Sequence, residues 1–287
     1  MNEPNNATFG MRIAQGFDVG KRLSVGIDPH DDLLSDWGLT NDAAGAEYFG
    51  RKIIAEAADS ALCVKPQIAF FERFGSAGFK ALESVLEDAR QAGVLVIADV
   101  KRGDIGSTFD AYAKSWLSPG SPLEADAMTV HAYQGFGTLK GALTLVERNN
   151  KGVFVLAATS NPEAKEIQTA RLSTNVTVAA AMVADATNWN QSHDQHQKVG
   201  SVGVVLGATL NLTDFEIDIE NQSTGPIIPI LAPGFGFQGA KLEEAADRFG
   251  SLASGLIVHE SRSVLKGGSA RLEERIRQHS EKIASVI

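Results

Sequence analysis

A chain of 287 residues with 44% hydrophobic and 21% charged side chains can bury a full core, which excludes a disordered protein and a small disulfide scaffold. Its 26 basic and 35 acidic side chains give a net charge of -9, the wrong sign for a general nucleic-acid binder. The single cysteine, Cys63, cannot form an intramolecular disulfide, no apolar run reaches the roughly 18 residues of a membrane span, and MNEPNNATFG lacks the pattern of a signal peptide. We therefore expect a cytoplasmic protein that does not enter membranes.

Short β-branched apolar runs recur along the chain, and each is followed by polar or glycine-rich residues and a helical stretch. Eight of these runs are predicted strands: 23–28, 61–65, 94–101, 127–131, 152–160, 202–209, 227–233 and 255–261. Continuous apolar runs indicate strands that are buried on both faces, as in a parallel sheet covered by helices. Eight such units favour a single-domain (β/α)8 TIM barrel, of the α/β class, over an open doubly wound sheet or two domains.

The segments between the predicted strands supply the outer layer of that barrel. Residues 43–60, 77–93 and 239–251 have apolar residues at helical spacing and a charged opposite face. The long interval at 161–200 is predicted to hold a helix and a polar insert within the same domain, 1–287. Functional residues of such barrels lie at the C-terminal ends of the strands. The predicted ends carry Asp28, Lys65, Asp99, Lys101, His131, Ser160, Pro233 and Arg262.

The most informative of these ends is the segment IADVKRGDIGST, which holds Asp99, Lys101 and Asp104. Residues at i and i+2 of a strand share a face, so Asp99 and Lys101 should both point toward the barrel axis. Gly103 permits a sharp turn, after which Asp104 begins the next loop. A lysine held between two carboxylates keeps its proton, which suits a proton donor. A solvated charge cluster is the alternative, but Lys65 on the preceding strand favours an alternating charge network.

A second motif, APGFGFQG, follows the seventh predicted strand. Its Gly234, Gly236 and Gly239 match the dinucleotide-binding fingerprint, but that fingerprint belongs to a first βαβ unit. In a barrel, the loops after strands 7 and 8 are the usual phosphate site. We therefore expect backbone amides of the glycine run, the Gln238 side chain and the charge of Arg262 to bind a phosphate, with an ordinary loop as the alternative.

Several other polar residues have a plain structural interpretation beside the functional one. Ser160 could bond a polar ring edge or cap the next helix. His131 is interpreted as a core histidine, and Cys63 as a core residue. His193 and His196 lie in SHDQHQ, which imitates a metal cluster, but this segment is predicted to be a solvated insert. The sequence therefore predicts no metal site.

Six motifs in order, VGIDP, CVKPQIAFFE, ADVKRGDIGST, TSNPEA, APGFGFQG and SRS, resemble the orotidine 5'-phosphate decarboxylase family, and specifically its longer bacterial branch. The resemblance covers residues 23–262. It implies a TIM barrel that converts orotidine 5'-monophosphate to uridine 5'-monophosphate and CO2 without a cofactor.

The resemblance also implies roles for individual residues. Lys65, Asp99, Lys101 and Asp104 match the family's charge network, and Lys101 matches its proton donor. The implied binding residues are Asp28 for the ribose hydroxyls, Ser160 for the pyrimidine, Gln238 and Arg262 for the phosphate, and the neighbouring Pro233, Gly234, Gly236 and Ser261. Ser261 stands where many relatives have glycine, and the role of His259 just before it is open.

The family resemblance further implies a homodimer in which Asp104, Ile105 and Thr108 reach into the neighbouring subunit's site. Two other functions remain as alternatives. One is a Mg²⁺-dependent sugar-phosphate synthase or decarboxylase of the same barrel superfamily. The other is a barrel that binds nucleotide monophosphates without catalysis, although such a binder would gain nothing from carboxylates beside an anionic ligand.

Overall fold

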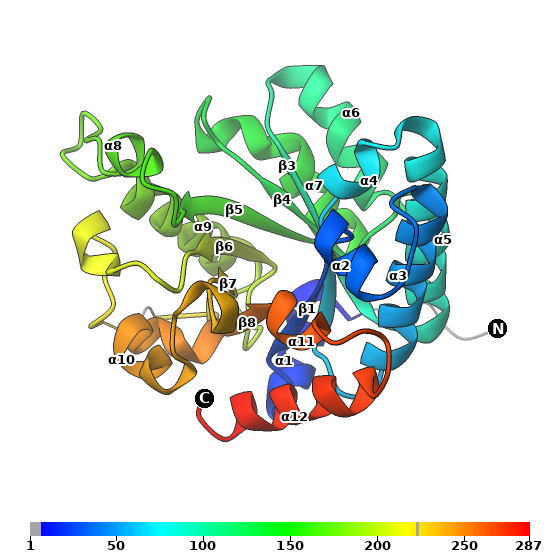
Figure 1. Ribbon diagram of the computed structural model, residues 1–287. Coiled ribbons are helices and arrows are strands. Elements are labelled where there is room, and N and C mark those ends of the chain that lie inside the picture. The colour runs from blue at the N-terminus through cyan, green and yellow to red at the C-terminus, as the bar shows by residue number, and fades with distance from the viewer. Residues whose placement is uncertain (1–6, 222–223) are drawn as a thin grey trace.

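The computed structural model describes residues 7–221 and 224–287. Eight strands form a closed parallel barrel in chain order, with β8 pairing back to β1 (Figure 1). The strands are β1 (Leu23–Ile27), β2 (Cys63–Pro66), β3 (Leu95–Arg102), β4 (Ala127–Val130), β5 (Gly152–Ala158), β6 (Val202–Leu206), β7 (Ile230–Pro233) and β8 (Leu256–Glu260). Each lies within or overlaps one of the eight predicted runs, so the predicted TIM barrel is confirmed.

Helices surround the barrel and fill the connections between strands (Figure 1). The α-helices are α1 (Phe9–Asp18), α2 (Asp31–Asp36), α3 (Ala43–Ala57), α4 (Ala69–Glu72), α5 (Gly75–Ala92), α6 (Gly106–Leu117), α7 (Lys140–Asn149), α8 (Ala164–Gln168), α9 (Val178–His193), α10 (Ala245–Phe249), α11 (Arg262–Leu265) and α12 (Leu272–Ala284). Short 3-10 helices are η1 (Phe136–Leu139), η2 (Leu212–Phe215), η3 (Gly236–Gln238), η4 (Leu242–Glu244) and η5 (Gly250–Gly255). No helix in the described ranges is long and apolar enough to cross a membrane.

Two of the predicted outer helices form as single helices and one does not. Residues 43–60 contain α3 and residues 77–93 hold most of α5, and the apolar faces of these helices are buried against each other and the barrel. The segment 239–251, with the same helical spacing, is also helical over most of its length, but it is divided into η4, α10 and the start of η5. Gly250 ends α10 with φ of 51°, and a Cβ there would lie 2.1 Å from the carbonyl oxygen of Ile219. This close approach bends the chain where helical periodicity would have continued it.

The N-terminal end of the barrel is closed by α1. The buried side chains Phe9, Ile13 and Phe17 form an apolar cluster with Leu95 of β3, Phe154 of β5 and other residues from the starts of the strands. The Phe9 and Phe154 rings meet edge to face at 5.9 Å, a favoured aromatic geometry. With this end filled by apolar side chains, the opposite, C-terminal end is the one that remains for a polar site.

The interval 161–200 contains α8 and the longer α9, which packs on β5 and β6. Asn190 fixes α9 to the barrel, because its side chain accepts from the N–H of Val202 and donates to the carbonyl oxygen of the same residue, at 3.0 and 2.7 Å. His193 and His196 are exposed, as predicted. The extent of an insert in this interval stays a prediction.

Candidate active site

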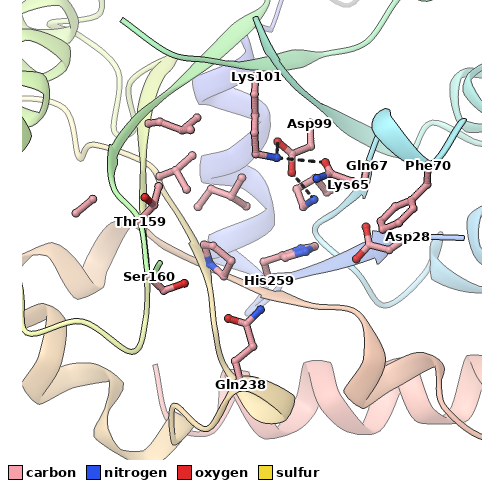
Figure 2. A pocket seen from close by; sticks show the side chains of 15 residues that line it. Asp28, Lys65, Gln67, Phe70, Asp99, Lys101, Thr159, Ser160, Gln238 and His259 are labelled. Carbon is pink, nitrogen blue, oxygen red and sulfur yellow. Dashed lines mark hydrogen bonds and ion pairs between the residues drawn. The ribbon is translucent and has the colours of Figure 1, made fainter. Parts of the chain in front are cut away.

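A cavity of about 310 Å³ opens at the C-terminal ends of the strands (Figure 2). Seven of the predicted site residues line it: Asp28, Lys65, Asp99, Lys101, Ser160, Pro233 and Gln238. These residues come from the ends of β1, β2, β3, β5 and β7 and from the turn after β7. The barrel therefore brings together side chains that lie more than 200 positions apart in the sequence.

An ion-paired triad occupies one end of this cavity. The Asp99 carboxylate lies between two ammonium groups, with Lys65 Nζ 2.7 Å from Oδ2 and Lys101 Nζ 2.6 Å from Oδ1 (Figure 2). Lys65 and Asp99 are 5% and 9% exposed, whereas the Lys101 side chain is 43% exposed. The buried pair is thus fixed within the barrel, and Lys101 is the member that reaches into open space.

Two further polar side chains hold the triad in place. The Thr129 hydroxyl, on β4, donates to Asp99 Oδ1 at 2.8 Å and accepts from the backbone N–H of Lys101 at 2.9 Å. The Lys101 ammonium donates to Gln67 Oε1 at 3.3 Å. Neither Thr129 nor Gln67 was singled out from the sequence. Gln67 could have been identified as a site residue from the sequence, because it lies two residues after Lys65 at a strand end. Thr129 could not, because nothing in the sequence distinguishes it from other threonines in strands.

The backbone at Lys101 is itself unusual. Lys101 has φ of 47°, a region that non-glycine residues rarely adopt, and the register between β3 and β4 shifts between Ala98 and Arg102. Strained backbone conformations of this kind cluster at functional sites, and they persist only where the surrounding contacts stabilise them. Here the Thr129 hydroxyl bonds the Lys101 amide, so the same contact stabilises the bulge and aims the side chain.

Burial and neighbouring charges shift the pKa values of the three triad residues in different directions. Burial lowers the pKa of Lys65, but the carboxylates of Asp99 and Asp28 outweigh it and the pKa is raised. For Asp99, burial acts to raise the pKa, but Lys65 and Lys101 outweigh it and hold the pKa far below its ordinary value. For Lys101, burial lowers the pKa, Asp99 opposes this, and the charge of Lys65 adds to it, so the pKa is lowered overall. An ammonium with a lowered pKa is a better proton donor near neutral pH.

Asp104 does not join the triad within the chain. It is absent from the cavity lining, and its Oδ1 accepts from the N–H of Ile105 at 2.8 Å. Just before it, a Cβ on Gly103 would come 2.3 Å from the ring of His131, so the chain packs closely against the segment that follows β4. Ile105 and Thr108 are likewise exposed outside the cavity. Lys101 therefore contacts one carboxylate in this chain rather than the predicted two.

A smaller cavity of about 70 Å³ adjoins the first, between the loops that follow β7 and β8. Gly234, Gln238, Ser261 and Arg262 of the predicted set line it. The Arg262 guanidinium carbon lies 3.8 Å from the centre of the Phe237 ring, a cation–π contact that holds the charge at the cavity mouth.

The glycine run makes the expected turn, but the amide of Gly236 is not free. Gly234 and Gly236 have φ of 123° and 68°, which only glycine adopts readily. Gly236 lines neither cavity, and its N–H donates to the carbonyl oxygen of Ala240 at 3.2 Å. This amide is used by the turn itself. The smaller cavity still offers polar side chains to an anion, among them Gln238, Ser261 and Arg262.

The structure also shows where Ser160, His131 and Cys63 lie relative to the main cavity. Ser160 lines the main cavity and does not cap α8, whose N-cap residue is Glu163. His131 is partly buried against Gly103 and does not line the cavity. Cys63 is fully buried, as predicted, and burial raises the pKa of its thiol to about 12. In the described residues, no group of three or more His, Cys, Asp and Glu side chains is placed to hold a metal ion.

Comparisons with known proteins agree with this geometry. The model of the orotidine 5'-phosphate decarboxylase / HUMPS family matches residues 21–268. Proteins named orotidine 5'-phosphate decarboxylase from Corynebacterium efficiens and Streptomyces coelicolor are each 44% identical over 261 and 260 residues, covering 91% of this chain and 91% and 90% of those proteins.

Solved structures give the same result. A Streptomyces avermitilis crystal structure that carries this enzyme name provisionally is 41% identical, with a TM-score of 0.90 over 100% of this chain and 98% of that one. The Leishmania donovani OMP decarboxylase structure is 28% identical, with a TM-score of 0.74 over 96% of each chain. The chain belongs to the orotidine 5'-phosphate decarboxylase family.

Proposed function

We propose that the chain decarboxylates orotidine 5'-monophosphate to uridine 5'-monophosphate and CO2, the last step of de novo pyrimidine nucleotide synthesis. The observation that carries the proposal is the buried Asp99 carboxylate between Lys65 and Lys101, at one end of a cavity whose other end adjoins Arg262. The substrate is a small molecule, and we expect the enzyme to act in the cytoplasm without nucleic acid or membrane.

The difficulty of the reaction explains why such a triad is needed. When the bond from C6 to the carboxylate breaks, the electron pair stays on C6, where no adjacent π-system accepts it. Preorganised charge must therefore stabilise it. The Lys101 ammonium faces the developing negative charge, and a proton then moves from Nζ to C6 to give uridine 5'-monophosphate. Lys101 is left neutral and regains its proton from solvent, while Asp99 and Lys65 keep its Nζ in position.

The far end of the substrate supplies binding energy. In this proposal the phosphate is bound by Arg262 and Gln238, the pyrimidine edge by Ser160 and the ribose hydroxyls by Asp28. Arg262 lines the smaller cavity and not the main one, so we expect it to contact the phosphate and not C6. Interactions with a non-reacting phosphate can still accelerate the reaction when their energy is used to orient the reacting carbon against Lys101.

An absorbance assay tests this function against both alternatives. Purified protein should consume orotidine 5'-monophosphate with loss of its absorbance, and the rate should be the same with and without EDTA. If EDTA abolishes turnover and added Mg²⁺ restores it, the result would favour the Mg²⁺-dependent synthase or decarboxylase of the same barrel superfamily. Binding of uridine 5'-monophosphate without any turnover would identify a barrel that only binds nucleotides.

We propose in addition that two chains form a homodimer and that Asp104, Ile105 and Thr108 complete the neighbouring chain's site. Ile105 is 60% exposed and precedes α6, and Tyr133 is 80% exposed in the loop after β4. The two loops are neighbours because Gly103 packs against His131. Large apolar side chains gathered at the exposed edge of a site are typical of a surface that another chain covers. Asp104 would then meet a partner's Lys101 rather than its own.

Mixing two inactive variants tests the shared site. Lys101→Ala and Asp104→Ala proteins, each nearly inactive, are unfolded and refolded together. A heterodimer then has one site with both lesions and one with neither, so isologous pairing of equal amounts should restore about a quarter of wild-type activity. If heterodimers are present by native mass spectrometry and no activity returns, Asp104 acts within its own chain.

A further inference from the structure

Four residues line both cavities, and they mark the middle of any ligand that spans them. These residues are Asp28, Pro233, Gln238 and His259. A nucleoside monophosphate has its base and phosphate at opposite ends and its sugar between them. Under the proposed function the base lies against Lys101 and the phosphate against Arg262 and Gln238, so the other three shared residues face the sugar. Of these four, His259 is the polar residue to which neither the sequence nor the proposed function gives a role.

The His259 ring is held at the cavity wall by the barrel itself. It lies on β8 in register with Ser24 of β1 and Pro233 of β7, and it is 8% exposed. Its Nδ1 lies 3.2 Å from the hydroxyl of Ser24, which is fully buried. Figure 2 shows the ring inside the pocket between Lys65 and Gln238 and beside Asp28. Because Ser24 engages one ring nitrogen and fixes the ring plane, the other edge is available to a ligand.

Polar groups that need partners surround the same point. A Cβ on Gly26 would lie 2.7 Å from Cβ of Ser261, 3.0 Å from Cε1 of His259 and 3.1 Å from Oδ2 of Asp28, so these three side chains converge on the bare glycine. Asp28 Oδ1 and Ser261 Oγ are buried and have no hydrogen-bond partner among the described residues. Buried polar atoms are almost always satisfied in proteins. This convergence therefore points to hydroxyl groups of a ligand.

We propose that His259 is a substrate-binding residue whose imidazole hydrogen-bonds a sugar hydroxyl of the bound nucleotide. This inference rests on the proposed function. Its chemistry fits, because a neutral imidazole both donates and accepts, as a hydroxyl does. Burial, and then the charge of Lys65, lowers the pKa of His259 to about 3, so the ring is neutral at physiological pH. A neutral ring adds no second positive charge beside Lys65.

The test compares three inhibitors on matched variants. Inhibition constants are measured for uridine 5'-monophosphate and its 2'-deoxy and 3'-deoxy analogues, with wild type, His259→Leu and His259→Gln. We expect His259→Leu to weaken uridine 5'-monophosphate about tenfold, the order of one buried hydrogen bond, and to leave unchanged the analogue that lacks the contacted hydroxyl. His259→Gln should recover part of the loss. His193→Leu, at an exposed histidine on α9, is the control and should change nothing.

Other outcomes decide against the inference. An equal loss for all three nucleotides means that His259 only packs, and no loss for any of them means that it makes no contact. If His259→Leu does not fold, His259→Asn, which keeps a polar group but shortens its reach, is judged by the same comparison. Wild-type turnover, measured on the same preparation, distinguishes a failure of the proposed function from a failure of the His259 inference. Absent turnover overturns the proposed function, whereas normal turnover with unaffected His259 variants overturns this inference alone.

Discussion

The two ends of the active-site cavity are built in opposite ways. At the triad end, every charged group is paired inside the chain, since Asp99 bonds Lys65, Lys101 and Thr129. At the end that adjoins Arg262, buried Asp28 Oδ1 after β1 and Ser261 Oγ after β8 have no partner among the described residues. One end has its polar groups paired before a ligand arrives, and in our proposal the hydroxyl groups of the ligand complete the other.

This difference follows from what each end has to do. Charge that stabilises a transition state must already be oriented, because reorganising it during the reaction would add to the barrier. Groups that bind a non-reacting part of the substrate need no such preparation and can leave their hydrogen bonds to the ligand. Substitutions at the triad end should therefore lower kcat and stability, and substitutions at the other end should lower affinity.

The largest effect is expected from Lys101→Ala. This change removes the proposed proton donor and one of the two charges on Asp99, so kcat should fall by at least about a thousandfold. Inhibition by uridine 5'-monophosphate should change far less. Steady-state kinetics and inhibition constants measure both, with Lys80→Ala at a 77% exposed position as the control. A kcat near that of wild type would contradict the assignment of Lys101.

Asp99→Asn should act on stability as well as on turnover. It leaves the buried Lys65 ammonium without its counter-charge, which typically costs about 3 to 5 kcal/mol. Glu124→Gln is the matched control, since Glu124 pairs with Lys151 at 2.7 Å outside the cavity. Glu124→Gln should lower the free energy of unfolding by less than Asp99→Asn does, and it should leave turnover unchanged. Equal losses of stability in the two variants would show that the triad is an ordinary ion pair.

The pH dependence of the Asp99 contribution has a defined sign. The folded pKa of Asp99 is depressed, so its contribution is present above the unfolded pKa of about 3.9 and is lost as pH falls toward the folded pKa. The stability difference between wild type and Asp99→Asn should thus be full at pH 7 and shrink below about pH 4. Urea denaturation at several pH values measures it.

Arg262→Ala tests the other end of the cavity. It removes a charged partner of a non-reacting phosphate, so KM should rise about 10- to 100-fold while kcat changes less. Arg277→Ala on α12, an exposed arginine paired with Glu281, should leave both constants unchanged. A defect confined to kcat would place the phosphate elsewhere and remove the contrast between the two ends.

Much of this architecture could be predicted from the sequence because its signals are local. Continuous apolar runs such as 202–209 identify buried parallel strands, and their ends identify the catalytic rim. The i and i+2 spacing of Asp99 and Lys101 likewise predicted two side chains in one cavity. Where a close tertiary contact overrides the local pattern, as Ile219 does at Gly250, the helical segment 239–251 is divided into short helices.

The features that could not be predicted depend on contacts between distant strands. The separation of Asp104 from the triad follows from the packing of Gly103 on His131, which no spacing rule contains. The use of the Gly236 amide by its own turn and the position of His259 beside Ser24 also appear only when the loops and strands are assembled. Thr129, from the neighbouring strand β4, is the clearest case, because its role depends entirely on its hydrogen bonds to Asp99 and to the Lys101 amide.

The smallest effect is expected from Thr129→Val, which keeps the shape of the side chain and removes its hydroxyl. Asp99 then loses one hydrogen bond and the Lys101 amide loses its acceptor, at a residue whose φ of 47° needs support. A hydrogen bond to a charged group is worth about 1.5 to 3 kcal/mol, so stability should fall by that order. The ammonium remains present but less firmly placed, and kcat should fall about tenfold with little change in KM. Thr187→Val, whose hydroxyl bonds only its own helix, is the control. An unchanged kcat in a destabilised Thr129→Val protein would mean that Asp99 and Gln67 position Lys101 without Thr129, and that the β4 side of the triad serves the fold rather than the reaction.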